Sequence, residues 1–215
     1  MSGSVLNFEE NGAILDAAGI PEDGRLDPLL PLALRARDGD SKAFELLYRE
    51  TRDLAYQVLF RLVGPHAELD DLLQETFLRL HGSLHAFRGE AKVTTFLYGV
   101  CANVVLMHFR KSRRRREESV TEIPEQVAGR SSDPEHAASV RQAARLLQRA
   151  LEALTPEKRV VYVYHEFLGL RQAEIAQALD ISPNTVRSRL SRARTELVDV
   201  LTRHRRELER ARGVR

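Results

Sequence analysis

The 215-residue chain has a single cysteine, Cys101, and no tryptophan. One thiol excludes an intramolecular disulfide framework and a zinc site built from cysteines, and it is typical of proteins in a reducing compartment. Proline and glycine number only 8 and 12, which excludes collagen-like and proline-rich low-complexity chains. With 43% hydrophobic and 30% charged residues, the chain can bury a core and is not disordered throughout.

Long hydrophobic runs are also missing. The longest uncharged stretch, from Val93 to Met107, is shorter than the roughly 20 apolar residues that a membrane-spanning helix needs. The first residues lack the basic-then-apolar order of a signal peptide. We therefore expect a cytoplasmic protein without membrane insertion.

Charge is concentrated locally, although the net charge is only +2. Residues 1–32 contain six acidic side chains and one basic one, whereas residues 171–215 contain eleven arginines and six acidic side chains. Six of the seven residues 110–116 are Arg or Lys. Such asymmetry is typical of nucleic-acid binding, although a basic run by itself is often a solvated surface.

Apolar residues recur at helical spacing and never in sustained alternation, which predicts an all-α fold. Three helices are expected before residue 112, and they make one compact unit. The first follows an N-cap at Asp40 or Ser41 and ends near Gly64. The second runs from about residue 67 to 81, with Gly82 as its C-cap. The third, over about 93–110, is so apolar that it must be largely buried.

A second helical unit is expected after a linker. Residues 117–136 are punctuated by Pro, Gly and Ser without periodicity, which predicts a flexible linker. Helical pattern resumes at about residue 137, and Thr155-Pro156 starts a helix that ends at Gly169. The chain is thus divided into five parts: an acidic, unassigned extension (1–37), a three-to-four-helix domain (38–116), the linker (117–136), a second small helical domain (137–201) and a basic tail (202–215).

The densest signal lies between Leu170 and Leu197. A short helix over residues 172–179 is followed by a tight break and by a second helix that starts at Pro183. Ser182 is the expected N-cap of that second helix. Two helices separated in this way form a helix-turn-helix, whose second helix contacts base edges in the major groove of DNA.

The second helix of this motif has two chemically distinct faces. Arg and Ser can hydrogen-bond base edges, and they gather on the face made of Arg187, Ser188, Ser191 and Arg192. The opposite, apolar face would pack on the preceding helices and contains Val186, Leu190, Ala193 and Leu197. Further arginines are expected at phosphates or in solvent: Arg189, Arg194, Arg203, Arg205 and Arg206.

These motifs resemble a known family. From Leu154, the strings Leu-Thr-Pro-Glu-Lys-Arg, Glu-Ile-Ala and Thr-Val-Arg-Ser-Arg-Leu-Ser-Arg-Ala-Arg resemble domain four of bacterial RNA polymerase sigma factors of the extracytoplasmic-function (ECF) group. The string from Asp70 to Leu80 resembles the core-binding helix of their domain two. Phe87-Arg88-Gly89, Phe96-Leu97-Tyr98 and Asn103 with the basic run are similar to its promoter-opening part. The two matches occur in the family's order.

The resemblance implies a transcription initiation factor without catalytic residues or cofactors of its own. It implies three partners: core RNA polymerase, at the β′ clamp and the β flap, promoter DNA and an anti-sigma factor. The β′ clamp would be contacted by Asp70, Asp71, Gln74 and Glu75. The minus-thirty-five element would be read by Thr185, Arg187, Ser188, Ser191 and Arg192. The minus-ten element would be recognised and opened, with one base flipped, by Phe87, Arg88, Lys92, Asn103, Arg110, Lys111, Arg113 and Arg114.

The chain departs from the family at four positions in the third helix. Phe96 stands where Trp is usual and keeps an aromatic for packing. Gly99 and Ala102 stand where basic residues are common, and Met107 where an acid is frequent. The missing positive charge bears on strand opening. Gly99 is also expected to weaken the helix by roughly 0.5–1 kcal/mol relative to Ala.

Two other functions remain open from the sequence. A stand-alone transcriptional regulator would carry a similar helix-turn-helix and bind repeated half-sites as a dimer. A helical module could instead bind polymerase without reading DNA. An enzyme has little support, because the seven histidines and Cys101 form no metal-binding signature and no phosphate loop or nucleophile elbow occurs. Cys101 is expected to be a buried, inert thiol.

Overall fold

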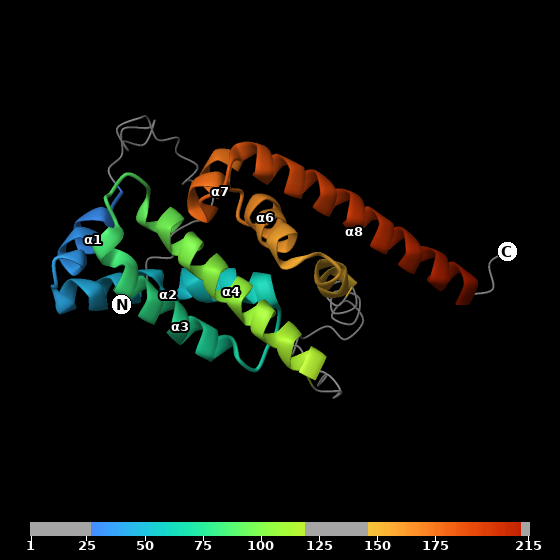
Figure 1. Ribbon diagram of the computed structural model, residues 1–215, viewed down its shortest axis with the longest axis horizontal. Coiled ribbons are helices and arrows are strands. Elements are labelled where there is room, and N and C mark those ends of the chain that lie inside the picture. The colour runs from blue at the N-terminus through green and yellow to red at the C-terminus, as the bar shows by residue number, and fades with distance from the viewer. Residues whose placement is uncertain (1–26, 119–145, 212–215) are drawn as a thin grey trace, which may run out of the picture.

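The computed structural model describes residues 27–118 and 146–211, and within these ranges it contains helices and no strand. This confirms the all-α prediction. Figure 1 shows the elements α1 (Leu30–Arg37), α2 (Ser41–Val63), α3 (Leu69–Ser83), η1 (Leu84–Ala86), α4 (Val93–Glu118), α6 (Pro156–Glu166), α7 (Gln172–Leu179) and α8 (Pro183–Ala211). Residues 146–152 are helical as well. The predicted linker lies outside the described residues, except for residues 117 and 118 at the end of α4, and so does the helical pattern over 137–145.

The first helical unit consists of α1 to α4. Helices α2, α3 and α4 pack against one another in pairs, and α1 packs on α2. The facing apolar side chains of the three long helices are buried together, among them Leu59, Leu62, Phe77, Leu97 and Val105. This burial supplies the main driving force for the unit, because isolated helices have little stability of their own.

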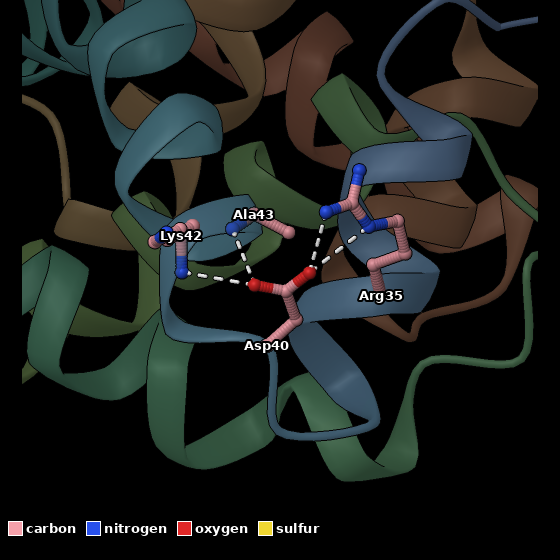
Figure 2. A network of polar contacts seen from close by, with 4 residues as sticks. All are labelled: Arg35, Asp40, Lys42 and Ala43. Atoms are coloured by element: carbon pink, nitrogen blue, oxygen red, sulfur yellow. Dashed lines mark hydrogen bonds and ion pairs between the residues drawn. The ribbon is translucent and has the colours of Figure 1, made fainter.

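Asp40 joins α1 to α2 (Figure 2). Its carboxylate accepts hydrogen bonds from the main-chain N–H groups of Lys42 and Ala43 at 3.0 and 3.1 Å, so it is the N-cap of α2. The other carboxylate oxygen accepts two hydrogen bonds from the guanidinium of Arg35, at 3.0 and 2.5 Å. The Arg35 hydrogen bond and then the Ala43 N–H hold the pKa of Asp40 below its ordinary value. The predicted N-cap is confirmed as Asp40.

The end of the acidic extension is folded onto this unit. Helix α1 buries Ala33 and Ala36 in a second, smaller apolar cluster. The Asp27 carboxylate accepts a hydrogen bond from the main-chain N–H of Val93 at 2.7 Å and thereby caps α4. Its other oxygen accepts from the N–H of Leu29 at 3.0 Å. Residues 27–37 therefore help to position the start of α4.

Helix α4 is the central helix of the molecule. The segment Val93–Arg114 is long and apolar enough to cross a membrane by length and composition alone, but 56% of its apolar window is buried inside the protein. Helices α2, α3, α6 and α7 all pack on it. Cys101 is fully buried there, as expected, and burial raises the pKa of its thiol to about 12. The helix continues to Glu118, so the basic run forms its last turns.

The second unit contains residues 146–152, α6, α7 and α8. Helix α8 packs on both α6 and α7 and then continues past the rest of the molecule (Figure 1). Two ion pairs fix α8 on α6: the Lys158 ammonium lies 2.5 Å from the Glu196 carboxylate, and the Arg194 guanidinium lies 2.7 Å from that of Glu166. Because α8 extends to Ala211, most of the predicted basic tail is helical.

The two units share one apolar core. Helix α7 packs along α4, and a single buried cluster contains side chains from both units. The buried Tyr164 hydroxyl of α6 donates a hydrogen bond to the main-chain oxygen of Tyr98 in α4 at 2.6 Å. The side-chain amide of Gln148 donates to the main-chain oxygen of Val63 at 3.3 Å. The two domains expected from the sequence are thus in direct contact in this structure.

The prediction that Gly82 caps α3 is wrong. Gly82 lies inside α3, and Leu84 in the right-handed region is the C-cap. The helix continues because Leu84 turns directly into η1 and is itself buried in the second apolar cluster. A Cβ atom at Gly82 would meet nothing within 4 Å, so neither strain nor a close approach requires glycine there.

Candidate nucleic-acid interface

Helices α7 and α8 form the predicted helix-turn-helix. The turn depends on Asp180, which adopts the left-handed conformation with φ 50° and ψ 50°. The main-chain N–H of Ile181 then donates to the Ala176 oxygen at 3.0 Å. The Ser182 hydroxyl accepts a hydrogen bond from the N–H of Thr185 at 3.1 Å, which confirms Ser182 as the N-cap of α8. Pro183 occupies the first helical position, as expected.

The two faces of α8 separate as the sequence predicts. The apolar face is buried against the preceding helices, with Val186 and Ala193 at 0% exposure, Leu190 at 2% and Leu197 at 5%. The polar face is exposed and consists of Arg187, Ser188, Ser191 and Arg192. Burial of one face therefore fixes the direction of the other, so that two guanidinium groups and two hydroxyls point away from the protein together.

Hydroxyl groups at the start of α8 are partly engaged within the helix. The Thr185 and Ser182 hydroxyl oxygens lie 2.8 Å apart. The Ser188 hydroxyl donates to the main-chain oxygen of Thr185 at 3.1 Å. A hydroxyl that donates locally keeps its acceptor lone pairs for a ligand. Thr185 is half-buried, so among the predicted minus-thirty-five residues it is the least accessible.

Some arginines of α8 are already engaged within the protein and are therefore less available for contacts with DNA. Arg194 is held by Glu166 through its Nε and one terminal nitrogen, at 2.9 and 2.7 Å. Arg203 donates to the Asp199 main-chain oxygen at 3.4 Å, and Arg205 lies 3.6 Å from the Glu209 carboxylate. Arg194 therefore stabilises the packing of α8 on α6.

Helix α4 carries a second exposed polar stripe. Asn103, Arg110 and Arg114 are exposed and lie at helical spacing on one face, with exposed Met107 between them. Exposed Lys111 and Arg113 flank this stripe. The predicted minus-ten residues of α4 are thus brought together along one side of the helix between residues 103 and 114.

In the loop before α4, Phe87 and Lys92 are less exposed than the predicted minus-ten residues on α4 itself. Phe87 is 5% exposed and belongs to the second apolar cluster, and its ring centroid lies 5.1 Å from that of Phe96. Phe87 therefore offers no open ring face for stacking on a base in this structure. Arg88 is exposed and Lys92 is half-buried. Phe96 packs against both apolar clusters, as expected for an aromatic that keeps the packing role.

Helix α3 presents an acidic face at its start. Asp70, Asp71 and Gln74 are exposed. The Glu75 carboxylate is half-buried and lies 2.5 Å from the Arg79 guanidinium. The opposite face buries Leu69, Leu72 and Leu73 in the core. Of the four predicted polymerase-contacting residues, three are open to a partner and one is already ion-paired.

The two positions that lack the family's basic residues are buried, and Gly99 lies against α7. Gly99 is buried and Ala102 is 0% exposed. A Cβ atom at Gly99 would lie closer than 3.0 Å to the main-chain oxygen of Ala178 in α7. A long basic side chain at position 99 is incompatible with this packing, which gives a physical reason for glycine at that position.

Three structural features were not predicted from the sequence: a cap of α4, a close contact between α4 and α7, and a cluster of side chains that could bind a metal. Asp27 caps α4 from 66 residues away, and the only local signal was an acidic residue followed by proline. From the sequence, Gly99 is only a residue that weakens its helix, and the structure shows that α7 packs directly against it. His66, Glu68 and His108 come together between the α2–α3 turn and α4, and their spacing along the chain matches no metal-binding motif.

Comparisons with known proteins match both helical units to described families. Residues 47–115 match the family described as Sigma-70 region 2, and residues 144–197 match Sigma-70, region 4. The chain is 32% identical over 169 residues to the ECF RNA polymerase sigma factor SigE of Mycolicibacterium smegmatis, a match that covers 77% of this chain and 65% of that protein. It is 30% identical over 175 residues to the ECF RNA polymerase sigma-E factor of Escherichia coli K12, covering 78% of this chain and 91% of that protein.

Solved structures support the same fold. The structure of CnrH in complex with the cytosolic domain of CnrY has a TM-score of 0.57 and 23% identity, and the match covers 87% of this chain and 98% of that one. The sigma factor RpoE in complex with the anti-sigma factor NepR from Bartonella quintana has a TM-score of 0.54 and 20% identity, with 75% and 98% covered. The two family matches and the identity to the relatives named above show that the chain belongs to the ECF group of RNA polymerase sigma factors.

Proposed function

We propose that this protein binds core RNA polymerase and directs it to promoters, where it reads the minus-thirty-five element with α8 and opens the minus-ten element with α4. The observation that carries the proposal is the polar face of α8, held outward by a fully buried apolar face. The role needs no catalytic chemistry from this chain, and it is exercised in the cytoplasm, where the polymerase acts.

Recognition of the minus-thirty-five element rests on α8. Arg187 and Arg192 can each donate two hydrogen bonds to O6 and N7 of guanine, and Ser188 and Ser191 can pair with several bases. Thr185 lies at the N-terminal end of the helix, where a phosphate is favoured by the helix dipole. The helix-turn-helix thus supplies both base contacts and a backbone anchor.

Opening of the minus-ten element rests on α4 and the loop before it. The stripe of Asn103, Arg110 and Arg114, flanked by Lys111 and Arg113, suits the backbone and bases of a displaced single strand. Phe87 would have to leave its apolar cluster before it could contribute to the pocket for a flipped base. Arg88 and Lys92 are the charged members of that loop.

Reading both elements at once requires the two units to separate. The elements lie about 25 base pairs apart, or about 85 Å along B-DNA at 3.4 Å per base pair. Helix α4 of the first unit and α7 of the second unit are in contact, so their axes lie only about 8–10 Å apart in this structure. We therefore assign the observed packing to the free protein and an opened arrangement to the promoter complex.

Docking to the polymerase is assigned to the acidic face of α3. Asp70, Asp71 and Gln74 would meet basic groups on the β′ clamp, while the second unit would meet the β flap. Two similar folds were solved with partners, CnrH with the cytosolic domain of CnrY and RpoE with the anti-sigma factor NepR. We extend this to an anti-sigma factor as the partner that holds the present chain inactive.

Run-off transcription tests the proposal. Core polymerase and genomic promoter fragments are incubated with and without the full chain, and start sites are mapped. New, promoter-specific start sites are expected only when both proteins are present. A dimer that binds operators alone and stimulates no transcript would favour the stand-alone regulator. Core binding without new start sites would favour a module that does not read DNA.

A further inference from the structure

Three side chains with metal-binding atoms meet beside the C-terminal half of α4. His66 and Glu68 lie in the turn between α2 and α3, and His108 lies on α4, 40 residues further along the chain. Their ligand atoms all lie within 4.8 Å of one another. The two imidazole rings meet edge to face with centroids 5.2 Å apart, and the Glu68 carboxylate lies 3.4 Å from Nδ1 of His108.

We propose that His66, Glu68 and His108 form a binding site for a divalent transition-metal ion of the Zn²⁺ type. Two imidazoles and one carboxylate are a donor set that zinc commonly takes, with a fourth position left to water. Magnesium and calcium instead prefer oxygen ligands throughout, so a site with two nitrogen donors selects against them.

The geometry requires only a small contraction. Zinc bonds of about 2.0–2.2 Å place tetrahedral ligand atoms roughly 3.4 Å apart, so the ligand atoms, which lie within 4.8 Å of one another, must draw together by up to about 1.4 Å. Two of them are free to do so, because His66 is exposed in a turn and the Glu68 side chain is 46% exposed. The third is an anchor, because the His108 side chain is only 10% exposed and rests against the Phe109 ring.

Metal binding would replace two weaker contacts. The main-chain N–H of Glu68 donates to Nδ1 of His66 at 3.2 Å, and Glu68 faces His108 at 3.4 Å. An ion takes the lone pairs of neutral imidazoles and the charge of the carboxylate, so it engages the same atoms more strongly. The ion would then link the turn before α3 to α4 and stabilise the first helical unit, because it binds only where the fold has assembled all three groups.

Isothermal titration of the full chain with zinc chloride, after dialysis against a chelator, tests the site. One ion per chain is expected to bind, and the melting temperature should rise with it. His66→Ala and Glu68→Gln should each weaken binding by at least about tenfold, since even outer-shell changes cost about 10–100-fold. His85→Ala removes another exposed histidine outside the cluster and should leave the affinity unchanged.

The two exposed ligands carry this test, because loss of the mostly buried His108 would also alter the packing of α4. Circular dichroism of each variant without metal establishes that the helices are intact. Co²⁺ titration gives a second readout, since its visible absorption reports nitrogen and oxygen coordination directly. Absence of saturable binding to the wild type, or equal affinity in His66→Ala, Glu68→Gln and the wild type, would overturn the proposal in favour of non-specific binding.

Discussion

The backbones of α4 and α7 touch where Gly99 faces Ala178. A Cβ atom built on Gly99 would lie closer than 3.0 Å to the main-chain oxygen of Ala178. Real Cβ atoms essentially never approach so closely, and a main-chain atom cannot rotate away as the end of a flexible side chain can. Because glycine has no Cβ atom, Gly99 therefore allows the two helical units to pack this closely.

Gly99→Ala should push α7 away from α4. Overpacking of this kind costs about 1–3 kcal/mol, while each unit keeps its own helices. Energy transfer between dyes on cysteines introduced at Asp53 in α2 and Arg203 in α8 measures the separation, because buried Cys101 does not react. The mean distance should increase and its distribution should broaden relative to the parent protein.

Gly82→Ala is the matched control for that change. Gly82 also lies inside a helix, but a Cβ atom there meets nothing within 4 Å. This substitution should leave the dye separation unchanged and raise stability by roughly 0.5–1 kcal/mol through helix propensity. Identical distance distributions for Gly99→Ala and the parent would mean that the helices accommodate the methyl group and that Gly99 does not control the packing.

Tyr164→Phe probes the same contact through a hydrogen bond. The Tyr164 hydroxyl is buried and donates to the Tyr98 main-chain oxygen at 2.6 Å. Its removal should lower the free energy of unfolding by about 0.5–1.5 kcal/mol in urea titrations. Tyr162→Phe, which alters a half-buried ring on the same helix, should change stability by no more than about 0.5 kcal/mol. Equal effects of the two changes would show that the buried hydrogen bond adds nothing.

The sequence predicts features that local chemistry decides. Asp40 and Ser182 have the side chains that N-caps need, and both are the observed caps. The apolar spacing of α8 predicts its buried face because a single helix period is enough to separate two sides. The helix-turn-helix follows from the same short-range signals.

Features that depend on distant contacts were missed. Gly82 resembles a helix stop, but the burial of Leu84 continues the chain into η1. Asp27 caps α4 only after α1 has folded beside it. The spacing along α4 cannot indicate that Gly99 lies under α7, since helix packing between distant segments leaves no local period. For the same reason the burial of Phe87 in an apolar cluster could not be predicted from its neighbours along the chain, and its contact with a flipped base remains a prediction.

Arg187→Ala should weaken promoter binding in a sequence-dependent way. If Arg187 reads a base, its loss costs about 1–3 kcal/mol on the preferred sequence and relaxes preference at one position. Competition binding of holoenzyme to promoter variants measures both effects. Arg194→Ala is the control, because Arg194 is ion-paired with Glu166 and is not expected to touch bases. A uniform loss across all sequences would assign Arg187 to a phosphate instead.

Asp71→Arg should weaken binding to core polymerase without changing DNA binding by α8. Asp71 is exposed at the start of α3, and reversing its charge would set like charges against a basic partner surface. Affinity for core enzyme is measured by fluorescence anisotropy with labelled sigma factor. Asp53→Arg reverses an exposed charge on α2 and should have little effect. Unchanged core affinity in Asp71→Arg would exclude the α3 face as the docking surface.

Arg159→Met should stabilise the protein. The Arg159 side chain is 3% exposed, and among the described residues its Nε and one terminal nitrogen have no hydrogen-bond partner. Its guanidinium lies 5.4 Å from the centroid of the Phe109 ring. Burial lowers its pKa to about 10, with nearby Glu152 opposing the shift. An apolar, unbranched side chain removes the cost of burying this charge, so the free energy of unfolding should rise by about 1 kcal/mol or more.

The pH dependence of that gain identifies its cause. Because burial lowers the pKa of Arg159 in the folded state to about 10, below its ordinary value, the cost of burying the charge is complete below pH 10 and declines as the pH rises above 10. The free energies of unfolding of Arg159→Met and of the parent protein, measured by urea titration, should therefore differ by a constant amount at neutral and mildly alkaline pH. The two values should converge in more alkaline solution. Arg149→Met, at an exposed position, should match the parent within about 0.5 kcal/mol. A loss of stability in Arg159→Met would instead show that the contact with Phe109 outweighs the cost of burying the guanidinium.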